Sequence, residues 1–280
     1  MTATLPQGPP ESLLDIDVLR APDGRTRVAA LTQQFPQRVT APMYLDEADR
    51  GMAFLCSQNP TGGSFPGDRL RTRVLTRGGS RLHLTGQSAT QVYAGASSHR
   101  YEFTVAPGAL LEHLPKVVIP HAGSEHDQLV RVDVAEGGTF VGWDSVAAGR
   151  IGSGERFAYT RFRSVTEVYS GGALAARDVV DLRPGGSDVL APGALAGRDY
   201  LATFFVVTPG APCADLAAGL HEELLRAPGV LGAVSTLPSG AGLAARLLAR
   251  RAPAINAALL ALWGCARRTL LLRDRPTVRM

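Results

Sequence analysis

Short runs in which apolar and polar residues alternate fill the chain from residue 25 to about residue 207. They are rich in Val, Leu, Thr, Tyr and Phe, and Gly or Pro stands at their ends. Because successive side chains of a strand point to opposite faces, this period of two predicts half-buried β-strands. The clearest examples span residues 69–76, 81–84, 101–105, 129–134, 140–143 and 157–169. This part of the chain is therefore predicted to be mainly β.

A weak internal repeat runs through the same region. Four segments each read as strand, glycine turn and strand, and their turn glycines recur at nearly even intervals: Gly79, Gly108, Gly138 and Gly172. Glycine adopts a positive φ without steric cost, which suits a hairpin turn. Such a recurrence predicts stacked layers of short hairpins, each burying one face against the next. The alternative is that glycine-rich turns recur by chance in an ordinary β protein.

The periodicity becomes helical beyond residue 209. Residues 213–226 carry apolar side chains at helical spacing, and residues 253–271 begin with proline and place apolar side chains along one side, so two helices are predicted. Between them, the apolar runs 230–237 and 243–249 flank the turn sequence LPSGAG and favour a hairpin.

These patterns predict one domain with two appendages. Residues 1–24 are Pro-rich and polar and are predicted to be a flexible arm. Residues 25–272 form a single β-rich domain, with a β body (25–208) and an α/β C-terminal part (209–272), and residues 273–280 form a tail.

Composition narrows the functional classes. The chain has 280 residues, 45% hydrophobic and 19% charged, which argues against disorder. Of the 29 basic residues 28 are arginines spread along the chain, so no nucleic-acid-binding surface is predicted. The three cysteines are odd in number and far apart, which argues against a disulfide framework and against a CxxC-type zinc site. No secretory signal and no membrane span are visible, so a cytoplasmic protein is expected.

The common nucleotide-binding and nucleophile motifs are absent, and one segment is dense in possible metal ligands. That segment is HAGSEHD, which contains His121, Glu125 and His126. Imidazole and carboxylate groups both bind borderline metals such as nickel or zinc, so a metal-dependent all-β hydrolase or isomerase is one hypothesis, with His83 as a possible further ligand. A solvated surface loop is the alternative.

Two polar residues occupy equivalent positions of the repeat. His83 and Glu112 each stand four residues after their turn glycine, so layers stacked in register would place one above the other. They would then belong to a polar line through or along the stack. The alternative places them on the outward face of alternating strands. Asp68 follows Gly67 in a turn, where an acidic side chain commonly accepts bonds from nearby backbone N–H groups.

Several segments together resemble the urease accessory protein UreD (UreH) family. They occur in the family's order and cover about residues 25 to 272, nearly the whole chain. The matching segments are PTGGSFPGDRL (60–70), SATQVYAG (88–95), LLEHLPKVVIP (110–120), FVGWD (140–144), GRIGSGERF (149–157), and LPSGAGLAARLL followed by LWGCARRTLL.

The resemblance implies a β-helix of stacked strands and a non-enzymatic scaffold. Proteins of this family bridge apo-urease to a helical accessory protein, UreF, and through it to a nickel-carrying GTPase, UreG. Nickel is thought to pass through a polar tunnel in the UreD-like subunit, so nickel is expected in transit and no cofactor is expected to be tightly bound. A transit path should bind weakly at several points, because a closed site would trap the ion.

Carried over by position, five residues are candidates to face that path, and two histidines in the variable segment are weaker candidates on chemistry alone. The five are Asp68, Thr90, Glu112, Asp144 and Glu155, and the two are His121 and His126.

The sequence also departs from the family pattern. Pro66 stands where the family usually has Gly, His113 where it has Trp, Lys116 where it has Gln, and Gln91 where it has Lys. An Asp replaces the usual Glu at position 144. These changes leave the fold expectation intact and weaken the transfer of individual tunnel residues and of the partner surface around residues 113–127.

The helix at 253–271 offers a possible docking surface for the helical partner through Leu259 and Trp263, with ordinary packing on the β body as the alternative. Three hypotheses for the function therefore stand side by side. They are a urease maturation scaffold, a metal-dependent all-β enzyme, and a β-rich binding module without a metal role.

Overall fold

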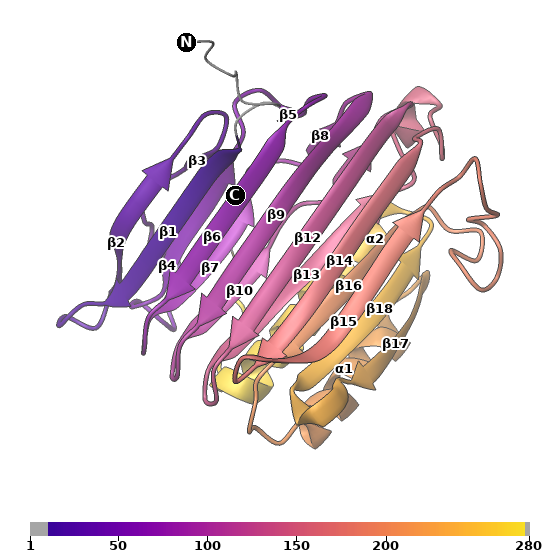
Figure 1. The fold of residues 1–280 in the computed structure, drawn as a ribbon. Helices are drawn as coiled ribbons and strands as arrows, with labels where there is room; N and C mark the ends of the chain where they lie inside the picture. The colour runs from indigo at the N-terminus through magenta and orange to yellow at the C-terminus, as the bar shows by residue number, and fades with distance from the viewer. Residues whose placement is uncertain (1–10, 278–280) are drawn as a thin grey trace, which may run out of the picture.

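A computed structural model describes residues 11–277 of the chain as three stacked layers (Figure 1). Sheet A has seven strands, in the order β15-β14-β12-β9-β6-β1-β2. Sheet B has eleven strands, and its main path runs β17-β18-β16-β13-β10-β7-β4-β3. The two α-helices pack on the face of sheet B that points away from sheet A. A mainly β protein with two helices in the C-terminal part was predicted, and this is confirmed.

The bounds of the elements follow from the chain order. Sheet A contains β1 (Ser12–Arg20), β2 (Thr26–Gln33), β6 (Arg69–Thr76), β9 (Gly95–Val105), β12 (Ser124–Val134), β14 (Arg161–Ser170) and β15 (Ala173–Leu182). Sheet B contains β3 (Arg38–Val39), β4 (Ala53–Gln58), β7 (Arg81–Gly86), β10 (Leu110–Leu114), β13 (Thr139–Ala147), β16 (Tyr200–Val207), β17 (Val230–Thr236) and β18 (Gly242–Ala249). The short strands β5 (Gly63–Ser64), β8 (Thr90–Val92) and β11 (Val118–Pro120) pair beside it. The helices are α1 (Ala214–Arg226) and α2 (Ala252–Leu271), with short 3₁₀ turns at Ile151–Ser153 and Pro238–Gly240.

The middle of the chain coils as a β-helix. From β6 it crosses to β7 in sheet B, passes through β8 and returns to sheet A as β9, and the cycle repeats through β10, β11 and β12. Equivalent strands of successive coils pair in parallel, as β6 with β9 and β9 with β12. One period of the glycine-turn repeat is therefore one coil of this helix.

The hairpin prediction is wrong for the first three glycine turns. The turns at Gly79, Gly108 and Gly137–Gly138 join strands of different sheets, and only the turn at Gly172 joins an antiparallel pair, β14 with β15. The strands on both sides of each turn must cover the same core, so the second strand folds over it instead of pairing with the first. In the third turn the positive φ of 74° belongs to Gly137 and not to Gly138.

The prediction of a flexible N-terminal arm is also wrong for residues 12–20. These residues form β1, which pairs in parallel with β6, and its alternate side chains Leu14, Ile16 and Val18 are buried. Their hydrophobicity outweighs the Pro-rich composition that suggested an arm. Residues 1–10 of the predicted arm and 278–280 of the predicted tail lie outside the described residues, and Arg273 of the tail forms an ion pair with Asp49.

The space between the sheets is apolar at one end and polar at the other. At the apolar end one row of sheet A carries Ile16, Val74, Phe103, Val132 and Val168 in register, and all five are buried. Moving toward the strand starts, the next inward row contains Thr72, Tyr101 and Thr166, and the row after it contains His99, Gln128 and Ser164. Burying apolar rows stabilises the sandwich, while the polar rows leave hydrogen-bonding groups facing inward.

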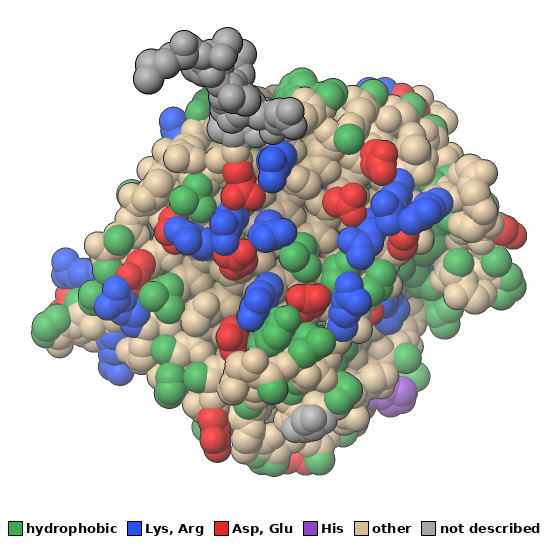
Figure 2. Space-filling view, in the orientation of Figure 1, with side chains coloured by type: hydrophobic (Ala, Val, Ile, Leu, Met, Phe, Trp, Pro, Cys, Tyr) green, Lys and Arg blue, Asp and Glu red, His purple; other side chains and the backbone are tan. Residues whose placement is uncertain are grey.

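Sheet A carries charges of both signs on its outer face (Figure 2). Arginines and carboxylates of neighbouring strands pair across it, as Arg71 does with Glu102 and Arg161 with Asp181. Pairs as exposed as these add little stability, so the sheet is held mainly by its inner face.

The C-terminal part follows its sequence pattern. Both predicted helices are present, and β17 and β18 form the predicted antiparallel hairpin. Leu259 and Trp263 are 2% and 3% exposed and belong to the core between α2 and sheet B. The docking role proposed for them is therefore wrong, because these side chains are used for packing. In the described residues 11–277, neither helix is long and apolar enough to cross a membrane.

Candidate functional site: polar cavities between the sheets

Three neighbouring cavities lie between the sheets, the first two among the polar rows and the third reaching the apolar row at Val168. The first measures about 90 Å³, the second about 30 Å³ and the third about 330 Å³. The first and second share Thr90, Tyr101 and His113 in their linings, and the second and third share Thr166 and Phe205. The cavities thus form a row that crosses the strands along the axis of the β-helix.

Strand alternation decides which side chains reach this row. On β9 the odd positions point inward, which brings His99 and Tyr101 to the first cavity. On β10 the side chain of His113 faces the cavities, while its neighbour Glu112 points through the other face of sheet B toward α2. Of these two adjacent residues, His113 therefore faces the space between the sheets and Glu112 faces the helix layer.

Asp144 supplies the carboxylate of the second cavity. It accepts a hydrogen bond of 2.5 Å from the Ser164 hydroxyl, which in turn accepts one of 3.2 Å from the Gln128 amide. Burial raises the pKa of Asp144, although these hydrogen bonds oppose the rise. No guanidinium pairs with it in the described residues, so its charge is only partly compensated.

The third cavity continues this polar line on sheet B. Thr203 lies beside Asp144 in the pairing of β13 with β16, and Arg246 lies beside Thr203 in the pairing of β16 with β18. Arg246 is ion-paired with Asp178 of β15. Carboxylate, hydroxyl and guanidinium groups thus follow one another from the second cavity to the third.

Two histidines of the row were not predicted as site residues. His99 was not singled out, and His113 was noted only as a departure from the family's Trp. Burial lowers the pKa of His99 well below its usual value and that of His113 to about 3, so both imidazoles are neutral near pH 7. Strand alternation could have identified His99, because it is an odd-numbered residue of β9 and so points to the same side as Phe103 and Val105.

The structure brings together only two of the residues predicted from the resemblance. Thr90 and Asp144 both line the second cavity. Asp68 closes its own turn, where a carboxylate oxygen accepts a 2.8 Å bond from the Phe65 N–H. Glu155 is paired with Arg150 at the surface, and hydrogen bonds to this arginine and a backbone N–H lower its pKa to about 2.

The proposed metal ligands His121, Glu125 and His126 do not converge. His126 points inward and its Nδ1 lies 2.9 Å from the Ser97 hydroxyl, whereas Glu125 points outward with Arg161 at 4.0 Å. The imidazole of His121 donates to the Gln91 side chain over 2.7 Å. Within residues 11–277 no three or more His, Cys, Asp or Glu side chains are grouped to hold a metal ion. The ligand set of the hydrolase hypothesis is therefore wrong.

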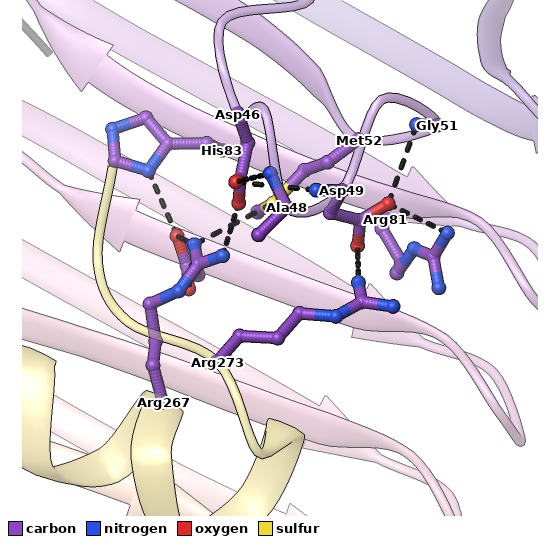
Figure 3. A network of polar contacts seen from close by, with 10 residues as sticks. Asp46, Ala48, Asp49, Gly51, Met52, Arg81, His83, Arg267 and Arg273 are labelled. Atoms are coloured by element: carbon purple, nitrogen blue, oxygen red, sulfur yellow. Dashed lines mark hydrogen bonds and ion pairs between the residues drawn. The ribbon is translucent and has the colours of Figure 1, made fainter. Parts of the chain in front are cut away.

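Glu112 belongs to a charge network between sheet B and α2. Figure 3 shows its partners His83 and Arg267 together with Asp46. His83 and Glu112 are paired in register, as predicted, and the His83 Nδ1 lies 2.9 Å from the carboxylate. Arg267 of α2 donates to the same carboxylate over 3.1 Å and forms a second ion pair with Asp46. Arg267 and Glu112 are both 0% exposed.

A second ion-pair group extends this network toward the C-terminus. Asp49 pairs with Arg81 at 2.7 Å and with Arg273 at 2.5 Å (Figure 3). With Asp46, Glu112 and Arg267, the two groups contain three carboxylates and three guanidiniums. This network ties the end of α2 to the loop before β4, and its charges are compensated.

The fold and its cavities define a β-helix-like protein that encloses polar space between two sheets. A family model described as UreD urease accessory protein matches residues 12–280. Similar proteins include the urease accessory protein UreD of Mycolicibacterium gilvum, 45% identical over 92% of this chain and 94% of the relative. Others are the urease accessory protein UreD 2 of Streptomyces griseus, at 33% over 99% and 96%, and UreD of Natronomonas pharaonis, at 30% over 93% and 88%. The chain belongs to the UreD urease accessory protein family, whose role is accessory and not catalytic.

Proposed function

We propose that this chain is a cytoplasmic scaffold that docks the nickel-delivering accessory proteins onto apo-urease and lets nickel reach the urease active site along the row of cavities. The relatives named above are urease accessory proteins, which supports a place in urease maturation. The observation that carries the path is the row itself, because its three cavities share lining residues across the width of the sandwich.

The chemistry of the row suits a transit path better than a storage site. Thr90 and Asp144 offer a hydroxyl and a single carboxylate in the second cavity, with neutral imidazoles beside them. A cation gains from the partly compensated charge of Asp144 without finding a closed set of ligands. Such weak contacts in series permit entry and release.

The partners in this proposal are apo-urease, a helical accessory protein of the UreF type and a nickel-carrying GTPase of the UreG type. Asp68, Glu112 and Glu155 were assigned to a nickel path by the resemblance alone, and none of the three lines the row of cavities. Thr90 and Asp144 have the lining position in addition, and they are the residues to test first.

The experiment is urease activation in a strain that lacks its own UreD gene, complemented with this chain. We expect Asp144→Asn to lower the nickel content of purified urease while the accessory partners still copurify with the variant. The matched control is Asp127→Asn, an outward-facing acid 3.5 Å from Arg163, which should leave the nickel content unchanged. Full nickel loading with Asp144→Asn would reject the path, and failure of the unmodified chain to restore urease would reject the scaffold.

A further inference from the structure

A fixed chain of hydrogen bonds sets the tautomer of His99. The side-chain amide of Gln37 donates to the Ser12 carbonyl over 2.7 Å and to the Arg71 carbonyl over 3.0 Å. Its oxygen is thereby oriented as an acceptor, and the Thr72 hydroxyl donates to it over 2.8 Å. Because this uses the only proton of the hydroxyl, His99 Nε2, 2.9 Å away, must carry the proton that Thr72 accepts.

The consequence is a free lone pair on His99 Nδ1. A neutral imidazole has one N–H and one basic nitrogen, and burial keeps this one neutral by lowering its pKa. In the part of the chain that the structure describes, no hydrogen bond to Nδ1 is found, and the residue lines the first cavity. Histidines that bind metals usually donate their other N–H to a fixed partner in this way.

His113 is the second unsatisfied imidazole. It is only 7% exposed and lines both the first and the second cavity. Its ring packs against Tyr101 and Phe103, with centroids 5.3 and 4.6 Å away, and residues 11–277 provide no hydrogen bond to either ring nitrogen. A neutral imidazole keeps one basic nitrogen, so this ring offers a lone pair to a cation in either cavity.

The two imidazoles contact the same tyrosine, Tyr101. The ring of His99 stacks on Tyr101 with a centroid distance of 3.8 Å, and the ring of His113 contacts the same tyrosine. Both histidines line the first cavity, and Asp144 follows in the second. A cation moving from the first cavity to the second would therefore meet nitrogen ligands before the carboxylate of Asp144.

We infer that His99 and His113 form a two-imidazole station that admits borderline divalent cations such as Ni²⁺ and Zn²⁺ and discriminates against Mg²⁺ and Ca²⁺. This inference rests on the proposed function, since it assigns selectivity to the same row of cavities. Imidazole nitrogen binds Ni²⁺ and Zn²⁺ well, whereas Mg²⁺ and Ca²⁺ require oxygen ligands. Two imidazoles leave the coordination shell of such a cation incomplete, which permits its release.

The test uses the purified full chain labelled with ¹⁵N at its histidines. Titration with NiCl₂ should broaden the resonances of His99 and His113 selectively, and MgCl₂ or CaCl₂ at the same concentrations should leave them unchanged. His113→Phe keeps the ring contacts and should weaken Ni²⁺ binding, measured by calorimetry, by at least about tenfold, or 1.4 kcal/mol. The matched control is His221→Gln, an exposed histidine of α1, which should leave the broadening of His99 and His113 intact.

Broadening confined to His221, or an equal response to Mg²⁺, would overturn the inference. If the His113→Phe variant does not fold, the spectra of the unmodified chain decide the question alone. Urease activation by the unmodified chain separates the two ideas. Activation without a nickel response at the histidines rejects the station and keeps the scaffold, whereas no activation rejects the proposed function.

Discussion

The row of cavities and the network at the end of α2 both contain buried carboxylates and imidazoles, but these groups differ in how far they are paired. In the network, Glu112 contacts His83 and Arg267, and Arg267 also pairs with Asp46. In the row, Asp144 has only neutral hydrogen-bond donors, and the nitrogens of His113 have no partner within residues 11–277. The charges of the network are compensated by ion pairs, whereas the charge of Asp144 in the row of cavities is compensated only in part.

The difference teaches that burial and residue type alone do not identify a functional acid. Glu112 and His83 are the more deeply buried pair, and they were the more conspicuous pair in the sequence repeat. Their partners make them a structural lock, because a cation would have to displace a guanidinium to reach the carboxylate. Asp144 and the two histidines of the row leave room for a cation.

The largest effect is expected from removing a positive charge of the network at the end of α2. Arg267→Met would leave Asp46 and Glu112 buried without their cation, which we expect to cost about 3–5 kcal/mol in the free energy of unfolding. Urea denaturation followed by circular dichroism measures the loss. Adding Asp46→Asn and Glu112→Gln to the same chain should recover much of it, because the stranded charges are then removed.

The neighbouring arginine provides the control. Arg268 is 51% exposed and pairs with Glu223, so Arg268→Met should change stability by only about 0–1 kcal/mol. Equal losses for the two arginine variants would mean that the network does not lock α2 to the body.

A second prediction concerns acid stability and the row of cavities. The folded pKa of His113 is about 3, below the ordinary value of 6.5, because burial disfavours the charged imidazole. As the pH falls from 6.5 toward 3, the unfolded chain binds a proton that the folded chain does not, so stability is lost in this window. His113→Phe should remove this loss, on the order of 3 kcal/mol at pH 4, because each pH unit in the window is worth about 1.4 kcal/mol.

The measurement is urea denaturation of both proteins at pH 7 and at pH 4. The difference between the two pH values should be smaller for the variant than for the unmodified chain. An unchanged difference would mean that His113 reaches solvent and binds a proton while folded.

Asp144 should show the opposite dependence on pH. Its pKa is raised above 3.8 by burial, so the folded chain binds a proton more readily than the unfolded chain, and this contribution to stability is lost as the pH rises through the folded pKa. Asp144→Asn removes the dependence. At pH 7 its stability should stay within about 1 kcal/mol of the unmodified chain, because relief of the buried charge opposes the weaker bond to Ser164. Denaturation from pH 3 to 7 measures this, and an unchanged profile would contradict it.

Much of the fold could be predicted because the strands, helices and coils each follow from a local periodicity of the sequence. The period of two located the strands, helical spacing located both helices, and the recurrence of the glycine turns located the coils. Two features could not be read this way. Whether a strand pairs with its neighbour or folds over the core depends on contacts far along the chain. The pairing of residues 12–20 likewise depends on β6, from which β2, β3, β4 and β5 separate them in the sequence.

The candidate site was predictable in part for the same reason. The equal distance of His83 and Glu112 from their turn glycines correctly predicted that the two residues lie side by side in neighbouring strands. Strand alternation does not show which face of sheet B borders the cavities and which borders α2, because both faces of this sheet are buried. His113 and Glu112 are adjacent in sequence and lie on opposite sides of that division.

The smallest effect is expected for a substitution on the outer face of sheet A, at Glu125. Glu125 lies on the same strand as His126 but points outward, is 44% exposed and has Arg161 at 4.0 Å. Glu125→Gln should therefore change stability by only about 0–1 kcal/mol and leave the nickel content of complemented urease unchanged. Metal analysis of purified urease beside the Asp144→Asn variant checks this. A loss of nickel equal to that of Asp144→Asn would mean that the metal crosses the outer face and not the space between the sheets.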